Sequence, residues 1–158
     1  MPVTLTLDMR EIIRSAHLCF AATVTPEGRP NVSPKGTTYV FDDNHLFFAD
    51  IRSPQTVENI RRGSTVEVNV VDPLVRKGYR FKGPAVVHER GSRPYTEALT
   101  LLREAGSTLA DRVKTIVIVE VREARSLVSP AYDDGSLSEA EIVRKFRERF
   151  AQLGSGVS

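Results

Sequence analysis

The chain has 158 residues, of which 41% are hydrophobic and 27% charged, and its formal net charge is +2. This composition is typical of one globular domain with a sizeable core. The small net charge argues against a protein that binds nucleic acid or a membrane surface electrostatically. One cysteine, Cys19, excludes an internal disulfide, and its apolar surroundings predict an inert core thiol. Because no apolar run has membrane-spanning length and the N-terminus lacks a signal-peptide core, we expect a cytoplasmic protein.

The beginning of the chain predicts a short helix followed by a pair of strands. Apolar residues at helical spacing indicate a helix over residues 7–17. Residues 18–25 are typical of a strand, and after a turn residues 29–33 form the returning strand. Pro34 interrupts this second strand, and a proline inside a strand requires an edge position, a bulge or a bend. We expect the strand to resume at Thr37.

A hairpin followed at once by a helix is the central feature of the chain. Residues 37–41 and 45–50 are rich in β-branched and aromatic residues, and three turn-forming residues separate them. Ser53 suits the N-cap of the next helix, Pro54 its first position and Gly63 a left-handed C-cap. The start of this helix therefore directs unpaired N–H groups and the positive end of its dipole toward whatever lies above it.

Polar side chains beside these N–H groups predict a phosphate cradle. They are the guanidinium of Arg52, the hydroxyls of Ser53 and Thr56, and the amide of Gln55. The alternative is that Ser53 merely caps a surface helix.

The second half of the chain predicts more strands and two further helices. Residues 64–72 alternate between valines and polar residues, which indicates a half-buried strand. A strand over residues 79–89 is broken at Gly83-Pro84, where we expect a bulge or a sharp bend. We predict a helix over residues 93–105 and one long strand over residues 114–128. A final helix over residues 137–153 has a capping box formed by Ser138 and Glu141 and an apolar stripe that ends with Phe150 and Leu153.

These elements predict a fold that is mainly β with peripheral α. Six or seven strands, mostly joined by short turns, favour a small antiparallel split barrel with flanking helices over a doubly wound parallel sheet. We expect a single domain over residues 1–158, with a frayed tail at residues 154–158.

Known catalytic motifs are missing. The sequence contains no G-x-S-x-G, P-loop, G-x-G-x-x-G or C-x-x-C motif. His17, His45 and His88 lack metal-ligand spacing, and the two Asp-Asp pairs are typical of turns. We therefore predict no metal site and identify no catalytic residue. A bound cofactor would supply the difficult chemistry instead.

The order of the motifs resembles the pyridoxamine 5′-phosphate oxidase-like family of FMN-binding split barrels. The hairpin AATVTPEGRPNVSP, a second hairpin that ends in Ala49-Asp50, a basic-polar loop that opens a short helix, and a later strand with KGPA carry this resemblance. It extends over roughly residues 7–128. It implies a homodimer with two FMN molecules at the subunit interface and a flavin-dependent oxidoreductase.

The resemblance also assigns roles to particular residues. The segment beside the isoalloxazine ring is Ser33, Pro34, Lys35, Gly36 and Thr37. Lys35 would stabilise negative charge on the reduced flavin, and its alternative is an exposed turn lysine. Ala49, Asp50 and Ile51 lead to the phosphate, whose binders are Arg52, Ser53, Gln55 and Thr56. Asn59, one turn later, is expected at the phosphate or ribityl chain, with an exposed helix residue as the alternative.

A second chain is expected to complete the pocket. Arg80 and Lys82 alternate on one face of their strand and would close the pocket from the partner chain, whereas the alternative is that they are solvated charges at a strand edge.

Two departures from the family pattern restrict the function. The chain has no tryptophan and no Arg-x-His motif near its end, which argues against oxidation of pyridoxamine 5′-phosphate itself. Ser-Pro-Gln-Thr stands where a second lysine or arginine often follows the phosphate loop, so the phosphate would depend on Arg52 and neutral donors. We expect an FMN-dependent oxidoreductase with an unidentified small-molecule substrate. The alternatives are a non-catalytic flavin-binding or flavin-storing protein, or a split barrel that binds haem, a deazaflavin or no flavin.

Overall fold

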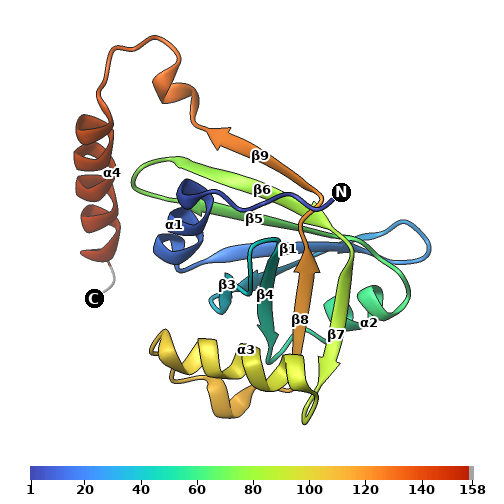
Figure 1. Ribbon diagram of the computed structural model, residues 1–158. Coiled ribbons are helices and arrows are strands. Elements are labelled where there is room, and N and C mark those ends of the chain that lie inside the picture. Colours follow the sequence, from blue (N-terminus) through green and yellow to red (C-terminus); the bar gives the residue numbers. More distant parts are fainter. Residues whose placement is uncertain (157–158) are drawn as a thin grey trace.

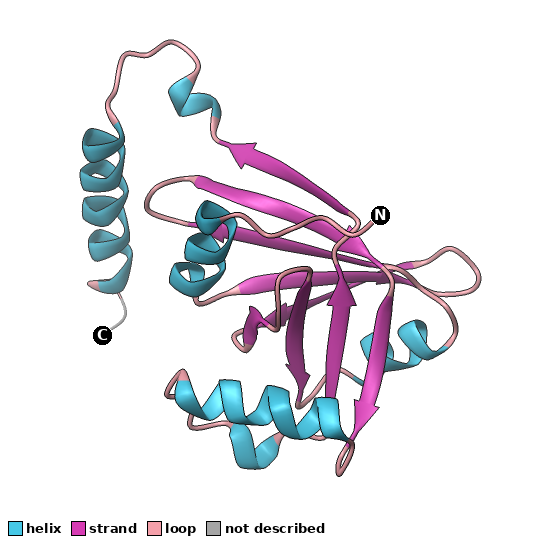
Figure 2. Cartoon of the chain, in the orientation of Figure 1, coloured by secondary structure: helices cyan, strands magenta, loops and turns pink. Residues whose placement is uncertain are grey.

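The computed structural model describes residues 1–156, whose nine strands form two antiparallel sheets flanked by four α-helices (Figures 1 and 2). In chain order the elements are α1 (Leu7–Ala16), β1 (Cys19–Val24), β2 (Pro30–Lys35), β3 (Thr38–Val40), β4 (His45–Asp50), α2 (Pro54–Arg61), β5 (Val66–Asp72), β6 (Lys77–Gly83), β7 (Ala85–Glu89), α3 (Arg93–Glu104), the 3-10 helix η1 (Ala110–Arg112), β8 (Thr115–Glu120), β9 (Glu123–Val128), the 3-10 helix η2 (Pro130–Tyr132) and α4 (Glu139–Gly154). The predicted class, antiparallel β with flanking helices, is confirmed. Of the tail expected at residues 154–158, Gly154 still belongs to α4, and residues 157 and 158 lie outside the described residues.

The chain passes from one sheet to the other at sharp bends. One sheet has five strands in the order β2-β1-β5-β6-β9, and the other has four in the order β3-β4-β8-β7. The chain passes directly between them after β2, after β6 and after β8. The first two bends confirm the predictions at Pro34-Lys35-Gly36 and at Gly83-Pro84. Pro34 is tolerated in β2 because β2 is the edge strand of its sheet.

The third bend was not predicted. The long strand expected over residues 114–128 is in fact two strands, β8 and β9, in different sheets. At the bend, the backbone N–H of Val121 donates to the carbonyl of Asn44 (2.9 Å), and that of Arg122 donates to the carbonyl of Lys82 (2.8 Å). These tertiary hydrogen bonds redirect the chain without a glycine or proline, so no local signal marks the break.

Gly83 is required where the bend after β6 meets the bend after β8. A Cβ atom at this position would lie 1.7 Å from the carbonyl oxygen of Glu120. We expect Gly83→Ala to lower the free energy of unfolding by about 1–3 kcal/mol, because the backbone must shift to relieve the overlap. Urea denaturation measures this loss. Gly154→Ala is the control, since a Cβ there meets nothing within 4 Å, and an equal loss in both variants would contradict the role of the close approach.

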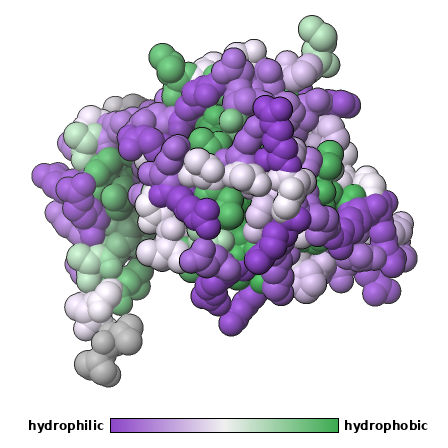
Figure 3. Space-filling view, turned by 60° about the horizontal axis from the view of Figure 1, so that its bottom comes forward, coloured by the Kyte–Doolittle hydropathy of each residue, from purple (hydrophilic) through white to green (hydrophobic). Residues whose placement is uncertain are grey.

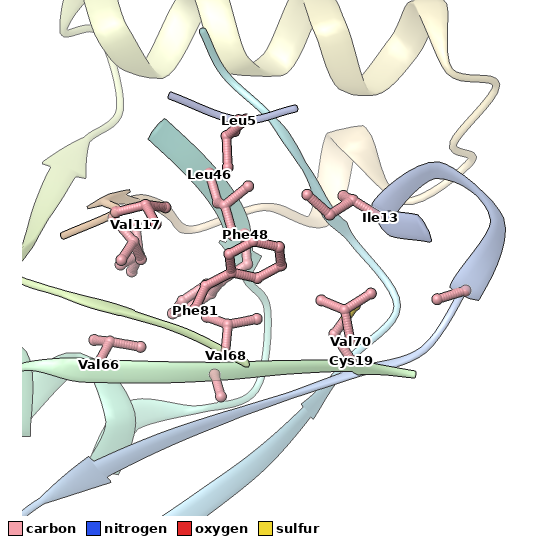
Figure 4. Packing of buried hydrophobic residues seen from close by; sticks show 14 of the residues in the cluster. Leu5, Ile13, Cys19, Leu46, Phe48, Val66, Val68, Val70, Phe81 and Val117 are labelled. Atoms are coloured by element: carbon pink, nitrogen blue, oxygen red, sulfur yellow. The ribbon is translucent and has the colours of Figure 1, made fainter. Parts of the chain in front are cut away.

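The core lies between the two sheets and beneath α1. Figure 4 shows Phe48, Phe81 and the valines of β5 directed toward one another in this core. Cys19 belongs to the same cluster, and burial raises the pKa of its thiol to about 11. This agrees with the predicted inert core thiol. A second cluster fills the space between the four-stranded sheet and α3.

Helix α4 begins at the predicted capping box and stands at the side of the molecule (Figure 1). Its first turn is tied to the sheet by the Lys77–Glu139 ion pair (2.7 Å), and the Arg76 guanidinium lies over the Phe146 ring. Figure 3 shows hydrophobic side chains along this helix, and Leu153 at its end is 65% exposed. No helix within residues 1–156 is both long and apolar enough to cross a membrane.

Candidate functional site

A groove of about 360 Å³ lies where β2 ends, β3 begins and β4 leads into α2. We call it the β2–β4 groove, and it is lined by Ser33, Pro34, Lys35, Gly36, Thr37, Ala49, Ile51, Arg52, Leu109 and Arg112. Eight of these ten residues were expected at the site from the sequence, and Leu109 and Arg112 were not. The structure therefore gathers the strand expected beside a flavin ring and the basic residue expected at its phosphate into one cavity.

The wall formed by residues 33–37 consists of the end of the edge strand β2, up to Lys35, and the crossing to β3. β2 pairs with β1 on one side, and within the described chain its other side has no strand partner. Gly36 lies at the crossing to β3, where a Cβ would make only an ordinary van der Waals contact with the carbonyl oxygen of His17, at 3.7 Å. An edge strand of this kind presents backbone N–H and C=O groups that can hydrogen-bond a planar polar ligand.

Lys35 is buried and not, as in the alternative interpretation, an exposed turn lysine. Its residue surface is 6% exposed, its Nζ donates a hydrogen bond to the hydroxyl of Ser53, and it lies over the Phe48 ring at 5.4 Å from the centroid. Burial lowers the pKa of Lys35, and the negative charge of Asp50 partly opposes this shift. Lys35 thus belongs to the wall of the groove, and its ammonium group is held against Ser53 and Phe48, partly removed from water.

The side chain of Asp50 holds the start of α2 in place through hydrogen bonds with Ser53. Its Oδ1 accepts hydrogen bonds from both the backbone N–H and the hydroxyl of Ser53, each at 2.9 Å, and its Oδ2 accepts one from the Thr115 hydroxyl at 3.4 Å. Ser53 occupies the N-cap position, but its hydroxyl does not cap the helix. Asp50 engages both donors of Ser53, and Ser53 does not line the β2–β4 groove. Its role as a phosphate binder stays a prediction. Asp50 itself faces this network and does not line the β2–β4 groove.

Thr56 and Asn59 lie on the buried face of α2, which packs against β1 and β2. Each is 1% exposed. Thr56 accepts a hydrogen bond from the Asn31 amide (3.0 Å), and the Asn59 amide donates to the Thr23 hydroxyl (2.9 Å). Neither residue lines the groove. Asn59 is therefore not an exposed helix residue, because both side chains have hydrogen-bond partners inside the protein. The expected contact of Thr56 and Asn59 with the phosphate or ribityl chain stays a prediction.

Gln55 is exposed and lies outside the β2–β4 groove. Its amide donates to the Oδ1 of Asn59 (2.8 Å), and it lines a neighbouring cavity together with Asp50. Of the four expected phosphate binders, Arg52 alone has its side chain in the wall of the β2–β4 groove.

Arg80 and Lys82 lie on the face of β6 that points away from the core. Both form ion pairs with Glu67 of the neighbouring strand, at 2.9 Å and 3.3 Å respectively. β5 and β1 separate their strand from β2, so within one chain they do not line the groove. Their contribution to a partner's pocket stays a prediction.

Leu109 and Arg112, which the sequence analysis missed, reach the groove from the segment between α3 and β8. They lie far from Arg52 in the chain, and no motif surrounds them. β4 and β8 are neighbours in the sheet, with Asp50 opposite Thr115, and this pairing brings the segment to the groove. Only knowledge of the strand pairing could have identified them.

The histidines lie outside this groove. His45 Nδ1 is 2.8 Å from the Oδ1 of Asp42, in the β3–β4 turn. Across the part of the chain that the structure describes, no group of His, Cys, Asp or Glu side chains is arranged to hold a metal ion.

Comparison with known proteins gives one family and several similar structures. The family model for pyridoxamine 5′-phosphate oxidase matches residues 5–125. A search of curated protein sequences finds no match. The crystal structure of HupZ from Group A Streptococcus is 28% identical, covers 78% of this chain and 94% of its own, and has a TM-score of 0.66.

Two more distant structures share the fold alone. HutZ, the haem storage protein from Vibrio cholerae, is 19% identical, covers 80% of this chain and 95% of its own, and has a TM-score of 0.63. A pyridoxamine 5′-phosphate oxidase-related, FMN-binding protein from Nostoc punctiforme is 16% identical, covers 76% of this chain and 78% of its own, and has a TM-score of 0.52.

Proposed function

Because this chain belongs to the pyridoxamine 5′-phosphate oxidase family, we propose that its β2–β4 groove binds FMN and that it is an FMN-dependent oxidoreductase for a small molecule. One observation carries this proposal. A single groove is lined by the end of the edge strand β2 with the crossing that follows it, by the buried residue Lys35 within this segment, and by the exposed Arg52.

These groups fit the chemistry of FMN. Unpaired backbone groups of β2 suit the polar edge of an isoalloxazine ring, and Arg52 suits a phosphate dianion through charge-assisted hydrogen bonds. When bound, FMN would supply hydride or electron transfer. Lys35 would hold a positive charge beside the ring, in a position fixed by Ser53 and Phe48. The protein would thus bind the cofactor, orient it and stabilise negative charge on it.

Haem is a weaker candidate for this groove. A haem iron bound by a protein commonly takes a histidine, cysteine, methionine or tyrosine as axial ligand. Among the described residues, none of these side chains lines the β2–β4 groove. The lining therefore offers cations for an anionic ligand but no side chain for a haem iron. A deazaflavin would contact the same groove residues and stays the alternative. Competition between a deazaflavin and FMN for binding to the protein would reveal it.

Turnover separates an enzyme from a flavin-storing protein. FMN-loaded protein is mixed anaerobically with NADH or NADPH, and then with an electron acceptor, while the flavin absorption band is followed. An oxidoreductase reduces and reoxidises its bound flavin over many cycles, faster than the same concentration of free FMN. Rates equal to those of free FMN with every donor and acceptor tried would contradict the enzyme proposal and favour storage.

We also propose a homodimer formed through the outer face of the five-stranded sheet. Phe20, Val24 and Val32 are 45%, 47% and 59% exposed on this face, and Arg80 and Lys82 lie on the same face. In an isologous contact, this face of one chain would pack against the same face of the other and bury the valines. Arg80 and Lys82 of each chain would then lie near strand β2 of the partner chain. This would supply the missing wall of the open groove.

Val32→Lys is expected to convert the dimer to a monomer, because it places a charge in the apolar part of this face. Light scattering coupled to size exclusion measures the mass of the particle. Val86→Lys is the matched control, since Val86 is an exposed valine (57%) on β7 of the other sheet. A wild-type monomer, or a dimer that survives Val32→Lys, would contradict the proposed interface.

A further inference from the structure

The β2–β4 groove contains a second exposed arginine that the sequence pattern does not identify. After Arg52, the residues that open α2 are neutral, where a second basic residue often follows in proteins of the resembled family. Arg112 reaches the same groove from the other side of the β4–β8 strand pair. Asp50 and Thr115 are paired, and the backbone N–H of Lys114 donates to the carbonyl of Asp50 at 2.9 Å. The segment leaving β4 and the segment entering β8 therefore run side by side, with one arginine on each.

The segment that carries Arg112 is held in place on both sides. Ala110 and Val113 are buried in the cluster beneath α3, at 6% and 0% exposure. The carbonyl oxygen of Val113 accepts hydrogen bonds from the Tyr95 hydroxyl (3.0 Å) and from the Arg90 guanidinium (3.1 Å). Arg112 is thus displayed from a fixed turn, so little backbone ordering would oppose its contact with a ligand.

The charge of Arg112 is not neutralised by its neighbours. Asp111, the adjacent carboxylate, pairs with Arg103 at 3.2 Å. Within residues 1–156, neither Arg112 nor Arg52 forms an ion pair, and no Asp or Glu lines the groove. Lys35, by contrast, lies in the field of Asp50. Two uncompensated guanidinium groups in one groove favour an anion with more than one negative charge.

We infer that Arg112 is the second cation of the phosphate site, so that Arg52 and Arg112 grip one phosphate dianion from the ends of two neighbouring strands. This inference rests on the proposed function, namely that the groove holds FMN. It gives the phosphate site a second cation that lines the groove, whereas Ser53 and Thr56 lie outside the groove and hydrogen-bond within the protein. Arg112 would also favour the phosphorylated flavin over riboflavin, which lacks the phosphate.

The test compares FMN with riboflavin. Dissociation constants for both flavins are measured by quenching of flavin fluorescence in the full-length wild type, in Arg112→Ala and in Arg93→Ala. We expect Arg112→Ala to weaken FMN binding about ten- to a hundredfold, the range of a charge-assisted hydrogen bond, with riboflavin binding unchanged. Arg93→Ala is the matched control, because Arg93 is exposed, pairs with Glu97 and does not line the groove. It should alter neither constant.

The other possible results of these binding measurements separate the role of Arg112 from FMN binding itself. Unchanged FMN affinity in Arg112→Ala, or equal weakening of FMN and riboflavin, would overturn the phosphate role of Arg112 while leaving FMN binding intact. Wild-type protein that binds neither flavin would overturn the proposed function and this inference together. If Arg112→Ala does not fold, Arg112→Gln is titrated at low and high salt. The inference then requires a smaller salt dependence of FMN affinity than in the wild type, since one cation is removed.

Discussion

Arg52→Ala is expected to weaken FMN binding by about a hundredfold or more, because it removes the exposed guanidinium that the groove places beside α2. Equilibrium dialysis with FMN measures the dissociation constant directly. The fold should be unaffected, since Arg52 forms no ion pair within the described chain and its side chain is exposed. An unchanged thermal midpoint would separate lost binding from lost structure.

The matched control for Arg52→Ala is Arg62→Ala at the other end of the same helix. Arg62 pairs with Glu58 at 2.6 Å and lies outside the groove. It carries the same charge, so its removal reproduces the change in net charge but not the change at the site. Equal FMN affinity in Arg52→Ala and the wild type would contradict the assignment of Arg52 to the phosphate site. Equal weakening of FMN binding in Arg52→Ala and Arg62→Ala would show that the effect comes only from the change in net charge.

Asp50→Ala is expected to lower the free energy of unfolding by about 3–5 kcal/mol, the range for removing one partner of a buried charged network. Asp50 is 6% exposed and accepts both donors of Ser53, and its charge opposes the loss of the proton from Lys35. Without Asp50, the Ser53 N–H group loses its hydrogen-bond acceptor, and the Lys35 ammonium loses its nearby negative charge inside the protein. Urea denaturation measures the change.

Two further variants establish the cause of that loss. Asp50→Asn keeps an acceptor for the Ser53 N–H group and is expected to lose less stability than Asp50→Ala. Asp43→Ala removes a carboxylate whose side chain is 83% exposed and which pairs with Arg10, so it should cost below about 1 kcal/mol. If Asp50→Ala proves no more destabilising than Asp43→Ala, the buried network is not what fixes the start of α2.

Local sequence signals were sufficient to predict most of the fold. Proline and glycine marked the bends after β2 and after β6, and the Ser138–Glu141 pair marked the start of α4. The bend at Val121–Arg122 left no such mark, because backbone hydrogen bonds to the distant residues Asn44 and Lys82 produce it. The β-branched run ends at Val121, but without a glycine or proline there the segment was not divided at this point.

The candidate site was predicted in part for a similar reason. The strand from Ser33 to Thr37 and the loop at Arg52 are local segments, and the groove contains both. Burial keeps two of the expected phosphate binders, Ser53 and Thr56, out of the wall of the groove. Ser53 and Thr56 have the right side chains at the right spacing, but Asp50 and Asn31 engage them within the protein. Arg112 was missed because strand pairing, not sequence position, brings it to the groove.

The visible absorption spectrum of the purified wild-type protein, recorded before and after addition of FMN and desalting, tests the central proposal most directly. We expect a flavin band that survives desalting, with one FMN for the single β2–β4 groove of each chain. A spectrum without retained flavin would contradict FMN binding. If added haem then gave a retained haem band, the chain would instead be a haem-binding split barrel.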